Sequence, residues 1–247
     1  MLNQMQNWLG EEEARLQKVG RPPFFKQVEQ DGVRRDELVS ALLTRYQVSH
    51  FFNDILGRTL ERLEEEGVPN NDPLTATLRE NLDEELGQSD NPYGEEVHDD
   101  ARARLIGALG IDYSAWSGKL GTFQNPGQLD SNPERFVHGM KALTEGPVIP
   151  LYSAMAYWEW RVSRSGEGDY KLFLDAFERL FPELKRETYS NTDALWHLYS
   201  HSVHDDDHAQ AFLRALSTTK NVDPIISGFH SASALWDRFW NLQTTQP

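Results

Sequence analysis

Residues 198–212 read LYSHSVHDDDHAQAF, and the interpretation of the whole chain depends on this stretch. If it is a helix, positions three or four residues apart share a face, and that face carries His201, Asp205 and His208. Apolar residues continue the same face on both sides, namely Ala194, Leu198, Phe212 and Leu216. Burying two imidazoles and a carboxylate costs several kcal/mol unless a partner satisfies them, and a bound metal ion commonly does so. The alternative is an exposed acidic turn with scattered histidines.

A rival face of the same helix carries His197 and His204, which are spaced in the same way. That face meets mainly small or polar residues, whereas Leu198 and Phe212 extend the face of His201. We therefore expect the metal-facing side to be that of His201, with His204 as a surface or neighbouring group.

The composition limits the function classes. The 247 residues are 38% hydrophobic with seven Trp, enough to fill the core of a soluble domain. The net charge of −15 opposes binding to nucleic acid or to anionic membranes. Since the chain has no cysteine, any metal must bind to histidine and carboxylate groups. No signal peptide or membrane span is predicted, so we expect a cytoplasmic protein.

Helical periodicity runs through the chain without any long β-alternation, which predicts an all-α fold. Residues 1–35 are expected to be an N-terminal extension that packs on one domain, 36–247. The predicted helices cover 36–66, a segment from Asp72-Pro73 to Gly87, 95–109, 132–145, 147–164, 169–180, 188–217 and 221–242. Residues 113–132 read as an irregular connection with one helical turn.

Three more titratable residues face inward by the same periodicity. Glu85 and Glu159 interrupt apolar stripes, and His98 lies on the inner face of the helix that starts near Glu95. Glu95 and His98 also form a Glu-x-x-His pair, which di-iron carboxylate bundles place on one helical turn. The simpler interpretation of one buried Glu is an ion pair with an arginine.

Taken together, the inward-facing residues come from four helices: Glu85, His98, Glu159, His201, Asp205 and His208. Three carboxylates and three imidazoles can neutralise two divalent ions, and nitrogen–oxygen ligation suits Fe or Mn. A catalytic zinc needs only about three protein ligands. The set therefore favours a centre with two metal ions.

The order of these residues resembles the haem-oxygenase-like di-iron oxidases and oxygenases. The resemblance rests on Asn81-Leu82-x-x-Glu85-x-Gly87, on His98 in a helix closing at Leu109-Gly110, on Glu159, and on His201-x-x-x-Asp205-x-x-His208. It covers roughly residues 36–240. This family shares a seven-helix bundle with the thiaminase-II and pyrroloquinoline-quinone-synthase families, so the resemblance implies that fold.

The resemblance also implies an enzyme that binds two Fe(II) ions and uses O2 as co-substrate. One iron would bind to Glu85, His98 and His208, and the other to Glu159, His201 and Asp205. Glu61 and Glu95 are further candidate ligands, although Glu61 also fits a solvated acidic helix end. The expected reaction is oxidation of a free amino acid or a small amino-acid-derived metabolite in a biosynthetic pathway, by desaturation, C–C cleavage, cyclisation or N-oxygenation.

Other functions remain open at this point. Within the family, oxidative decarboxylation of a fatty acid is an alternative. A thiaminase-II-type enzyme would need an active-site cysteine, which the chain lacks, and a metal-free helical interaction protein would leave the histidines on the surface. The expected partners are a small-molecule substrate and, as the family allows, an external electron donor or a second copy of the chain. Candidate substrate-binding residues are His50, Asn53, Arg102, Trp158 and Arg161.

Overall fold

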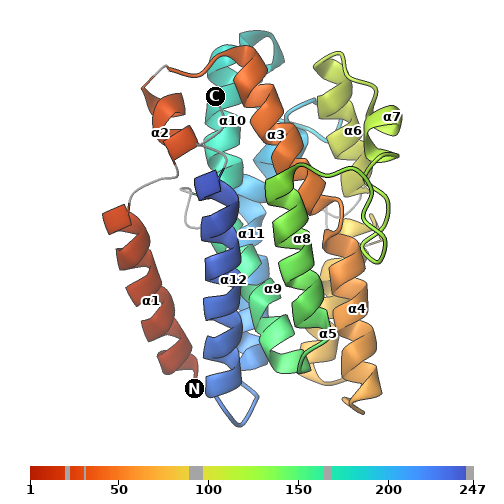
Figure 1. The fold of residues 1–247 in the computed structure, drawn as a ribbon, viewed down its shortest axis with the longest axis vertical. Coiled ribbons are helices and arrows are strands. Elements are labelled where there is room, and N and C mark those ends of the chain that lie inside the picture. The colour runs from red at the N-terminus through yellow and green to blue at the C-terminus, as the bar shows by residue number, and fades with distance from the viewer. Residues whose placement is uncertain (20–22, 31, 89–96, 164–167, 243–247) are drawn as a thin grey trace.

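The computed structural model describes residues 1–247 except 20–22, 31, 89–96, 164–167 and 243–247 (Figure 1). Within the helices, the side chains of residues 18, 19, 29, 204–206, 241 and 242 also lie outside the description. The described residues form α-helices and one 3-10 turn, with a single isolated β-bridge between Gly121 and Pro126. The predicted all-α class is therefore confirmed.

The chain forms its helices in the following order. They are α1 (Leu2–Val19), α2 (Pro23–Glu29), α3 (Arg35–Ser49), α4 (Phe52–Glu65), α5 (Pro73–Glu85), α6 (His98–Ala108), α7 (Tyr113–Ser117), α8 (Ser131–Thr144), α9 (Val148–Ser163), α10 (Asp169–Leu180), the 3-10 turn η2 (Pro182–Leu184), α11 (Trp196–Leu216) and α12 (Asp223–Leu242). The stretch 198–212 lies within α11, as predicted.

Local signals at the ends of α5 are those expected from the sequence. The Asp72 side chain accepts a hydrogen bond from the Leu74 backbone N–H at 2.9 Å, and Pro73 occupies the first helical position. Gly87 follows the helix with φ of 66°, a conformation that glycine adopts without strain. These two signals place Glu84 and Glu85 in the last turn of α5.

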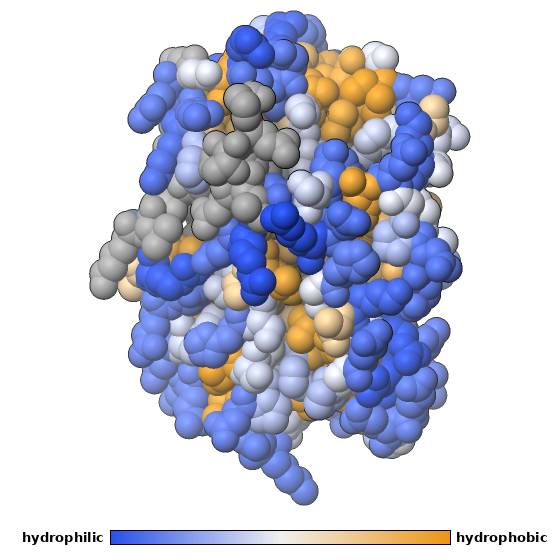
Figure 2. Space-filling view, in the orientation of Figure 1, coloured by the Kyte–Doolittle hydropathy of each residue, from blue (hydrophilic) through white to orange (hydrophobic). Residues whose placement is uncertain are grey.

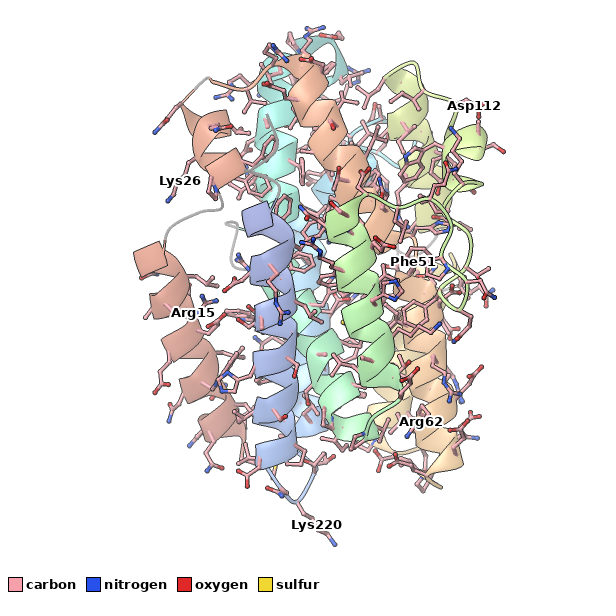
Figure 3. The ribbon with its side chains drawn as sticks, in the orientation of Figure 1. Arg15, Lys26, Phe51, Arg62, Asp112 and Lys220 are labelled. Atoms are coloured by element: carbon pink, nitrogen blue, oxygen red, sulfur yellow. The ribbon has the colours of Figure 1, made fainter. Side chains whose placement is uncertain are left out.

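The single long helix predicted for 36–66 is wrong, because the chain bends at His50 and Phe51 and continues as a separate helix α4. A buried side chain enters the helix at this point: Arg102 Nη1 donates to the carbonyl oxygen of Ser49 at 3.3 Å. Insertion of a side chain into the ladder of backbone hydrogen bonds is a recognised cause of kinks. Figure 3 shows Phe51 at this junction between α3 and α4.

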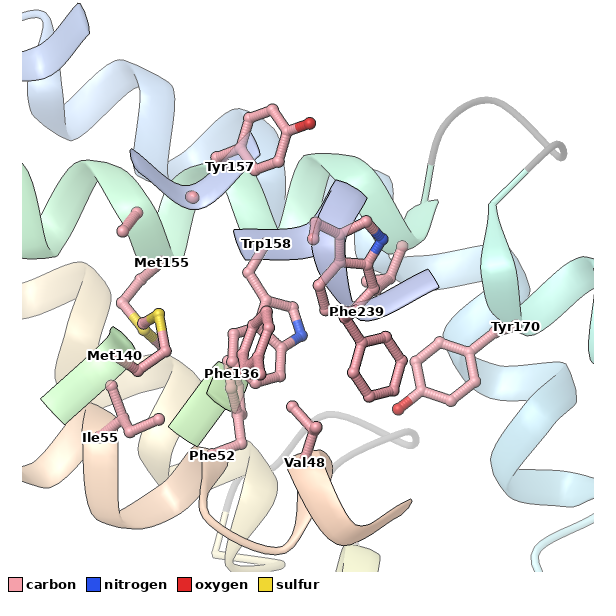
Figure 4. Close-up of a cluster of buried hydrophobic side chains, with 14 of the residues drawn as sticks. Val48, Phe52, Ile55, Phe136, Met140, Met155, Tyr157, Trp158, Tyr170 and Phe239 are labelled. Carbon is pink, nitrogen blue, oxygen red and sulfur yellow. The ribbon is translucent and has the colours of Figure 1, made fainter. Parts of the chain in front are cut away.

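Helix α9 forms the centre of the bundle. Nearly all of its residues are buried, and it packs most extensively against α11 and α12. Its Trp158 lies against Phe52 of α4 and Phe136 of α8, with ring centroids 4.9 and 5.1 Å away, and Tyr170 of α10 flanks the same cluster (Figure 4). Glu159, the next residue of α9, is also buried.

The N-terminal helices contribute to the same core. Met5 of α1 and Phe25 of α2 are fully buried in the main hydrophobic cluster. Arg15 of α1, labelled in Figure 3, reaches Asp237 of α12 at 2.8 Å, and the two helices lie side by side in Figure 1. Helices α1 and α2 therefore pack on the bundle through apolar contacts, and α1 also through a charged one.

The face of the molecule drawn in Figure 2 is mostly hydrophilic, with hydrophobic residues in separate spots. This agrees with the excess of acidic residues in the chain. Among the described helices, none has both the length and the apolar character that crossing a bilayer requires.

Candidate metal centre

Three of the predicted ligands meet in one buried group. Glu85 comes from the last turn of α5, His98 from the first residue of α6, and His201 from the first half of α11. One ligand atom from each residue lies within 4.8 Å of the other two, and all three residues are buried. Atoms that share one first-row metal ion lie roughly 3 to 4 Å apart, so this group has the size of a metal site.

The contact between His98 and Glu85 has the character of two ligands that converge on a third point. His98 Nδ1 lies 2.7 Å from Glu85 Oε1. Nevertheless, among the described residues this nitrogen has no hydrogen-bond partner with acceptable angles. Ligands of one metal ion would lie this close together without a hydrogen bond of good geometry between them.

Two of the three residues, Glu85 and His201, hold the protonation states that bind metal. Burial by itself would raise the pKa of Glu85, but the neighbouring His98 and Arg102 lower it to about 2. Burial, together with the nearby His98, holds the pKa of His201 well below its usual value. At neutral pH, Glu85 is therefore an anion and His201 a neutral imidazole, which are the forms that bind metal.

A second acidic and imidazole group lies beside the first. His208 Nε2 contacts Glu84 Oε2 in a short hydrogen bond, and His208 Nδ1 lies 3.9 Å from Glu159 Oε2. Glu84 is the residue before Glu85 on α5, and His208 lies seven residues, or about two turns, after His201 on α11. Helices α5 and α11 therefore contribute to both groups, while α6 adds His98 to the first and α9 adds Glu159 to the second.

The two groups border a shared cavity. Its volume, counted as room for the centres of water-sized spheres, is about 20 Å³, which is enough for a water molecule or a single ion. Glu85 and His201 of the first group and Glu159 of the second line it. The rest of the wall consists of Ser49, Phe52, Arg102, Trp158, Val162 and Tyr170. Tyr170 stacks on the His201 ring at 4.5 Å and holds it in place.

Behind the first group lies a supporting network that the sequence did not indicate. Arg102 Nη2 contacts Glu85 Oε2 at 3.3 Å, and Arg102 Nε donates to His197 Nε2 at 3.2 Å. Because arginine only donates, His197 Nε2 must accept, so Nδ1 carries the proton that it shares with Tyr46 Oη at 3.0 Å. His197 is thus occupied as an acceptor for Arg102, and this leaves His201 as the metal-facing histidine of the pair.

The grouping differs from the expected partition. His201 belongs with Glu85 and His98, whereas His208 belongs with Glu84 and Glu159. Glu84 did not emerge from the sequence, although its step of three from the buried Asn81 was a usable signal. At the end of a helix, two adjacent residues can both face a large cluster, and a single-stripe pattern selects only one of them.

The structure describes only one of the remaining candidate ligands in full. Glu61 is 65% exposed on α4 and pairs with Arg58 at 2.9 Å, as the solvated-end interpretation predicted. Glu95 and the side chain of Asp205 lie outside the described residues, as does the side chain of His204.

The candidate substrate-binding residues occupy different places. Trp158 and Arg102 line the cavity, but the Arg102 guanidinium is already bound to Glu85, Asp99, His197 and the Ser49 carbonyl. His50 Nε2 lies 3.1 Å from the Gly121 carbonyl oxygen, near the half-buried Asn53, so both residues belong to the α3–α4 junction. Arg161 is buried on α9 and does not border the cavity.

Comparisons of the chain with protein-family models, with curated proteins and with solved structures find no match.

Proposed function

We propose that the protein is a non-haem di-iron enzyme that activates O2. The observation that carries this proposal is the convergence of Glu85, His98 and His201 in one buried group beside Glu84, Glu159 and His208. Six carboxylate and imidazole groups on four helices of the bundle are costly to bury without metal. Nitrogen and oxygen donors without sulfur suit iron, with manganese as the nearest substitute.

When bound, the iron would supply the electrons and the open coordination positions for the reaction with O2. The protein contributes the remaining functions. Arg102 holds the Glu85 carboxylate at 3.3 Å, and Tyr170 fixes the plane of the His201 ring. Phe52, Trp158 and Val162 form the apolar part of the cavity wall and exclude bulk water.

We also propose a haem-oxygenase-like bundle and a small substrate that carries an amino-acid carboxylate, as the family resemblance implies. We further propose a cytoplasmic location. A fatty acid is the alternative substrate within the same chemistry. An all-α core with ligands on α5, α6, α9 and α11 is compatible with each of these.

A mononuclear iron enzyme is the second candidate, and one observation favours it. The tightest group consists of two histidines and one carboxylate, which is the ligand set of many mononuclear non-haem iron oxygenases. In that case, Glu84, Glu159 and His208 would form a hydrogen-bonded shell around one ion. Iron stoichiometry separates the two candidates.

The direct test of function is rapid mixing of the Fe(II)-loaded protein with O2. Absorbance and O2 consumption would be followed with free amino acids and with fatty acids added in turn. We expect one substrate class to accelerate O2 consumption. A protein that binds no iron and consumes no O2 with any substrate would instead support the metal-free interaction protein.

A further inference from the structure

Arg102 of α6 is a buried cation that joins parts of the chain far apart in the sequence. Its Nη2 atom donates to Glu85 Oε2 at 3.3 Å, and its Nε atom donates to His197 Nε2 at 3.2 Å. Its Nη1 atom lies 3.1 Å from Asp99 Oδ1 and 3.3 Å from the Ser49 carbonyl oxygen. All three nitrogen atoms of the guanidinium are therefore engaged, and they connect α3, α5, α6 and α11.

The side-chain partners of this arginine stand beside the three ligands of the metal group. Glu85 is a ligand itself, and Asp99 directly follows His98 at the start of α6. His197 precedes His201 by four residues, about one helical turn, and their ring centroids are 4.6 Å apart. One guanidinium thus contacts one ligand directly and the close neighbours of the other two.

Arg102 is itself held in place. His197 Nδ1 shares a hydrogen bond with Tyr46 Oη at 3.0 Å, and Tyr113 Oη donates to Asp99 Oδ1 at 2.9 Å. A positive charge near a metal ion weakens the binding of that ion by repulsion, but the Asp99 carboxylate offsets the charge of the guanidinium. The benefit of Arg102 to the site therefore lies in its planar shape, which fixes the directions of its donors.

The contacts of Arg102 give the two oxygens of Glu85 different tasks. Oε2 accepts the hydrogen bond from Arg102, whereas Oε1 lies 2.7 Å from His98 Nδ1. Oε1 is therefore the oxygen that faces another ligand, and Oε2 is engaged by the guanidinium. Without this hydrogen bond, the carboxylate would be free to rotate and to offer an ion either oxygen or both.

We propose that Arg102 is the positioning residue of the metal group, because it keeps Glu85 as a one-oxygen ligand and holds the group assembled before an ion binds. His197 supports the site through Arg102. The inference rests on the proposed function only in taking Glu85, His98 and His201 as metal ligands. A group assembled in advance loses little freedom when the ion arrives, so its affinity is higher.

Metal affinity tests this inference independently of any reaction with O2. Anaerobic competition with a chromogenic chelator measures Fe(II) affinity, and the absorption spectrum of bound Co(II) reports on coordination geometry. We expect Arg102→Met to weaken binding of one ion per chain roughly tenfold or more and to change the Co(II) spectrum. Arg102→Lys should also weaken it, because lysine keeps the charge but has no planar fork to reach both Glu85 and His197.

A pair of variants at His197 leaves the arginine in place. In His197→Gln the amide oxygen can still accept from Arg102 Nε, so metal affinity should stay within about threefold of the natural value. His197→Leu has no acceptor and should lose more than that. Arg62→Met is the matched control, because Arg62 of α4 donates to the Thr144 carbonyl oxygen at 2.8 Å outside the metal group. Its affinity and spectrum should not change.

Several results would overturn the inference. Natural affinity and an unchanged Co(II) spectrum in either Arg102 variant, shown to be folded by circular dichroism, would do so. If neither Arg102 variant folds, the pair at His197 decides, and equal affinity in His197→Gln and His197→Leu would be the contrary result. An equal loss in Arg62→Met would indicate a general weakening of the fold instead of positioning.

The inference and the proposed function can fail separately. Normal metal uptake that does not depend on Arg102 would overturn the inference alone. Metal uptake without any O2 consumption would refute the proposed O2 chemistry and leave the role of Arg102 in place. A natural chain that binds neither Fe(II) nor Co(II) would overturn both.

Discussion

Glu84 is the residue whose role the structure adds to the predicted site. It contacts His208, and Glu159 lies on the other side of that imidazole. Glu84→Gln should lower iron binding from about two ions per chain to about one, because the amide is a weak ligand and the second group loses a negative charge. Iron analysis after anaerobic loading measures the effect.

Glu80→Gln provides the matched control. Glu80 lies one turn earlier on the same helix and is exposed. The Glu80→Gln variant should retain the iron content of the natural chain. If Glu84→Gln also retained full iron, Glu84 would be a hydrogen-bonding partner of His208 rather than a ligand.

His201 and His208 of α11 should bind different ions. His201→Ala should remove the ion held with Glu85 and His98, and His208→Ala the ion held with Glu84 and Glu159. Each variant should lose roughly one iron equivalent and most activity while keeping its helical content. His204→Ala should be much milder. Equal iron loss in His204→Ala and His201→Ala would place the metal on the other face of α11.

At the residue scale, periodicity predicted the inward position of Glu85, His98, Glu159 and His201, all of which are buried. It could not predict the pairing of each histidine with its carboxylates. Pairing depends on how far α5 and α11 are shifted along each other, and a pattern within one helix carries no information on that shift. His197 was placed on a polar face for a related reason, because its partner Arg102 comes from another helix.

The packing of α9 against α12 depends on one glycine. A Cβ atom on Gly228 would lie 2.3 Å from the Pro150 carbonyl oxygen and 2.7 Å from Ser153 Cβ, both on α9. Gly228→Ala should therefore push the helices apart and destabilise the protein by about 1–3 kcal/mol. Urea unfolding measures this change in the free energy of unfolding.

Gly57→Ala is the corresponding control within helix α4. A Cβ atom at Gly57 would meet nothing within 4 Å. Alanine should stabilise this helix by about 0.5–1 kcal/mol, since it lowers the entropy cost of helix formation. A Gly228→Ala protein as stable as Gly57→Ala would mean that α9 and α12 are less closely packed than described.

At the element scale, caps and breakers predicted most helix boundaries within a few residues. One exception is the start of α11, which was expected at residue 188 and lies at Trp196. The other is the junction of α3 and α4, where no proline or glycine interrupts residues 46–55. The bend is produced by Arg102, which lies 53 positions after Ser49 in the chain and binds its carbonyl oxygen. A contact so distant in sequence leaves no local signal.

At the scale of the whole molecule, Glu12 connects the N-terminal helix to the bundle. Its buried carboxylate accepts hydrogen bonds from Arg15, from Tyr157 of α9 at 2.9 Å and from Ser233 of α12 at 2.7 Å. Burial alone would raise the pKa of Glu12, but these donors lower it below its usual 4.5. Glu12→Gln should therefore cost about 1–3 kcal/mol of stability at neutral pH.

The contribution of Glu12 to the free energy of unfolding should depend on pH with a definite sign. A carboxylate with a depressed pKa in the folded state stabilises the protein above its unfolded pKa, and this contribution disappears as pH falls through the folded value. The stability difference between the natural chain and Glu12→Gln should thus be constant above pH 4.5 and shrink below it. Urea unfolding across this range measures it, with the exposed neighbour Glu11→Gln as control. A difference that is unchanged at low pH would contradict the assigned role.

Iron content per chain is the most direct test of the proposed centre. The protein would be loaded with Fe(II) without oxygen, freed of excess metal and analysed for iron and protein. The six-residue site predicts about two ions per chain, and fewer in Glu85→Gln, because one ion loses its anionic ligand. One ion per chain would contradict the di-iron site in favour of a mononuclear one, and iron at background level in the natural chain would contradict a metal centre altogether.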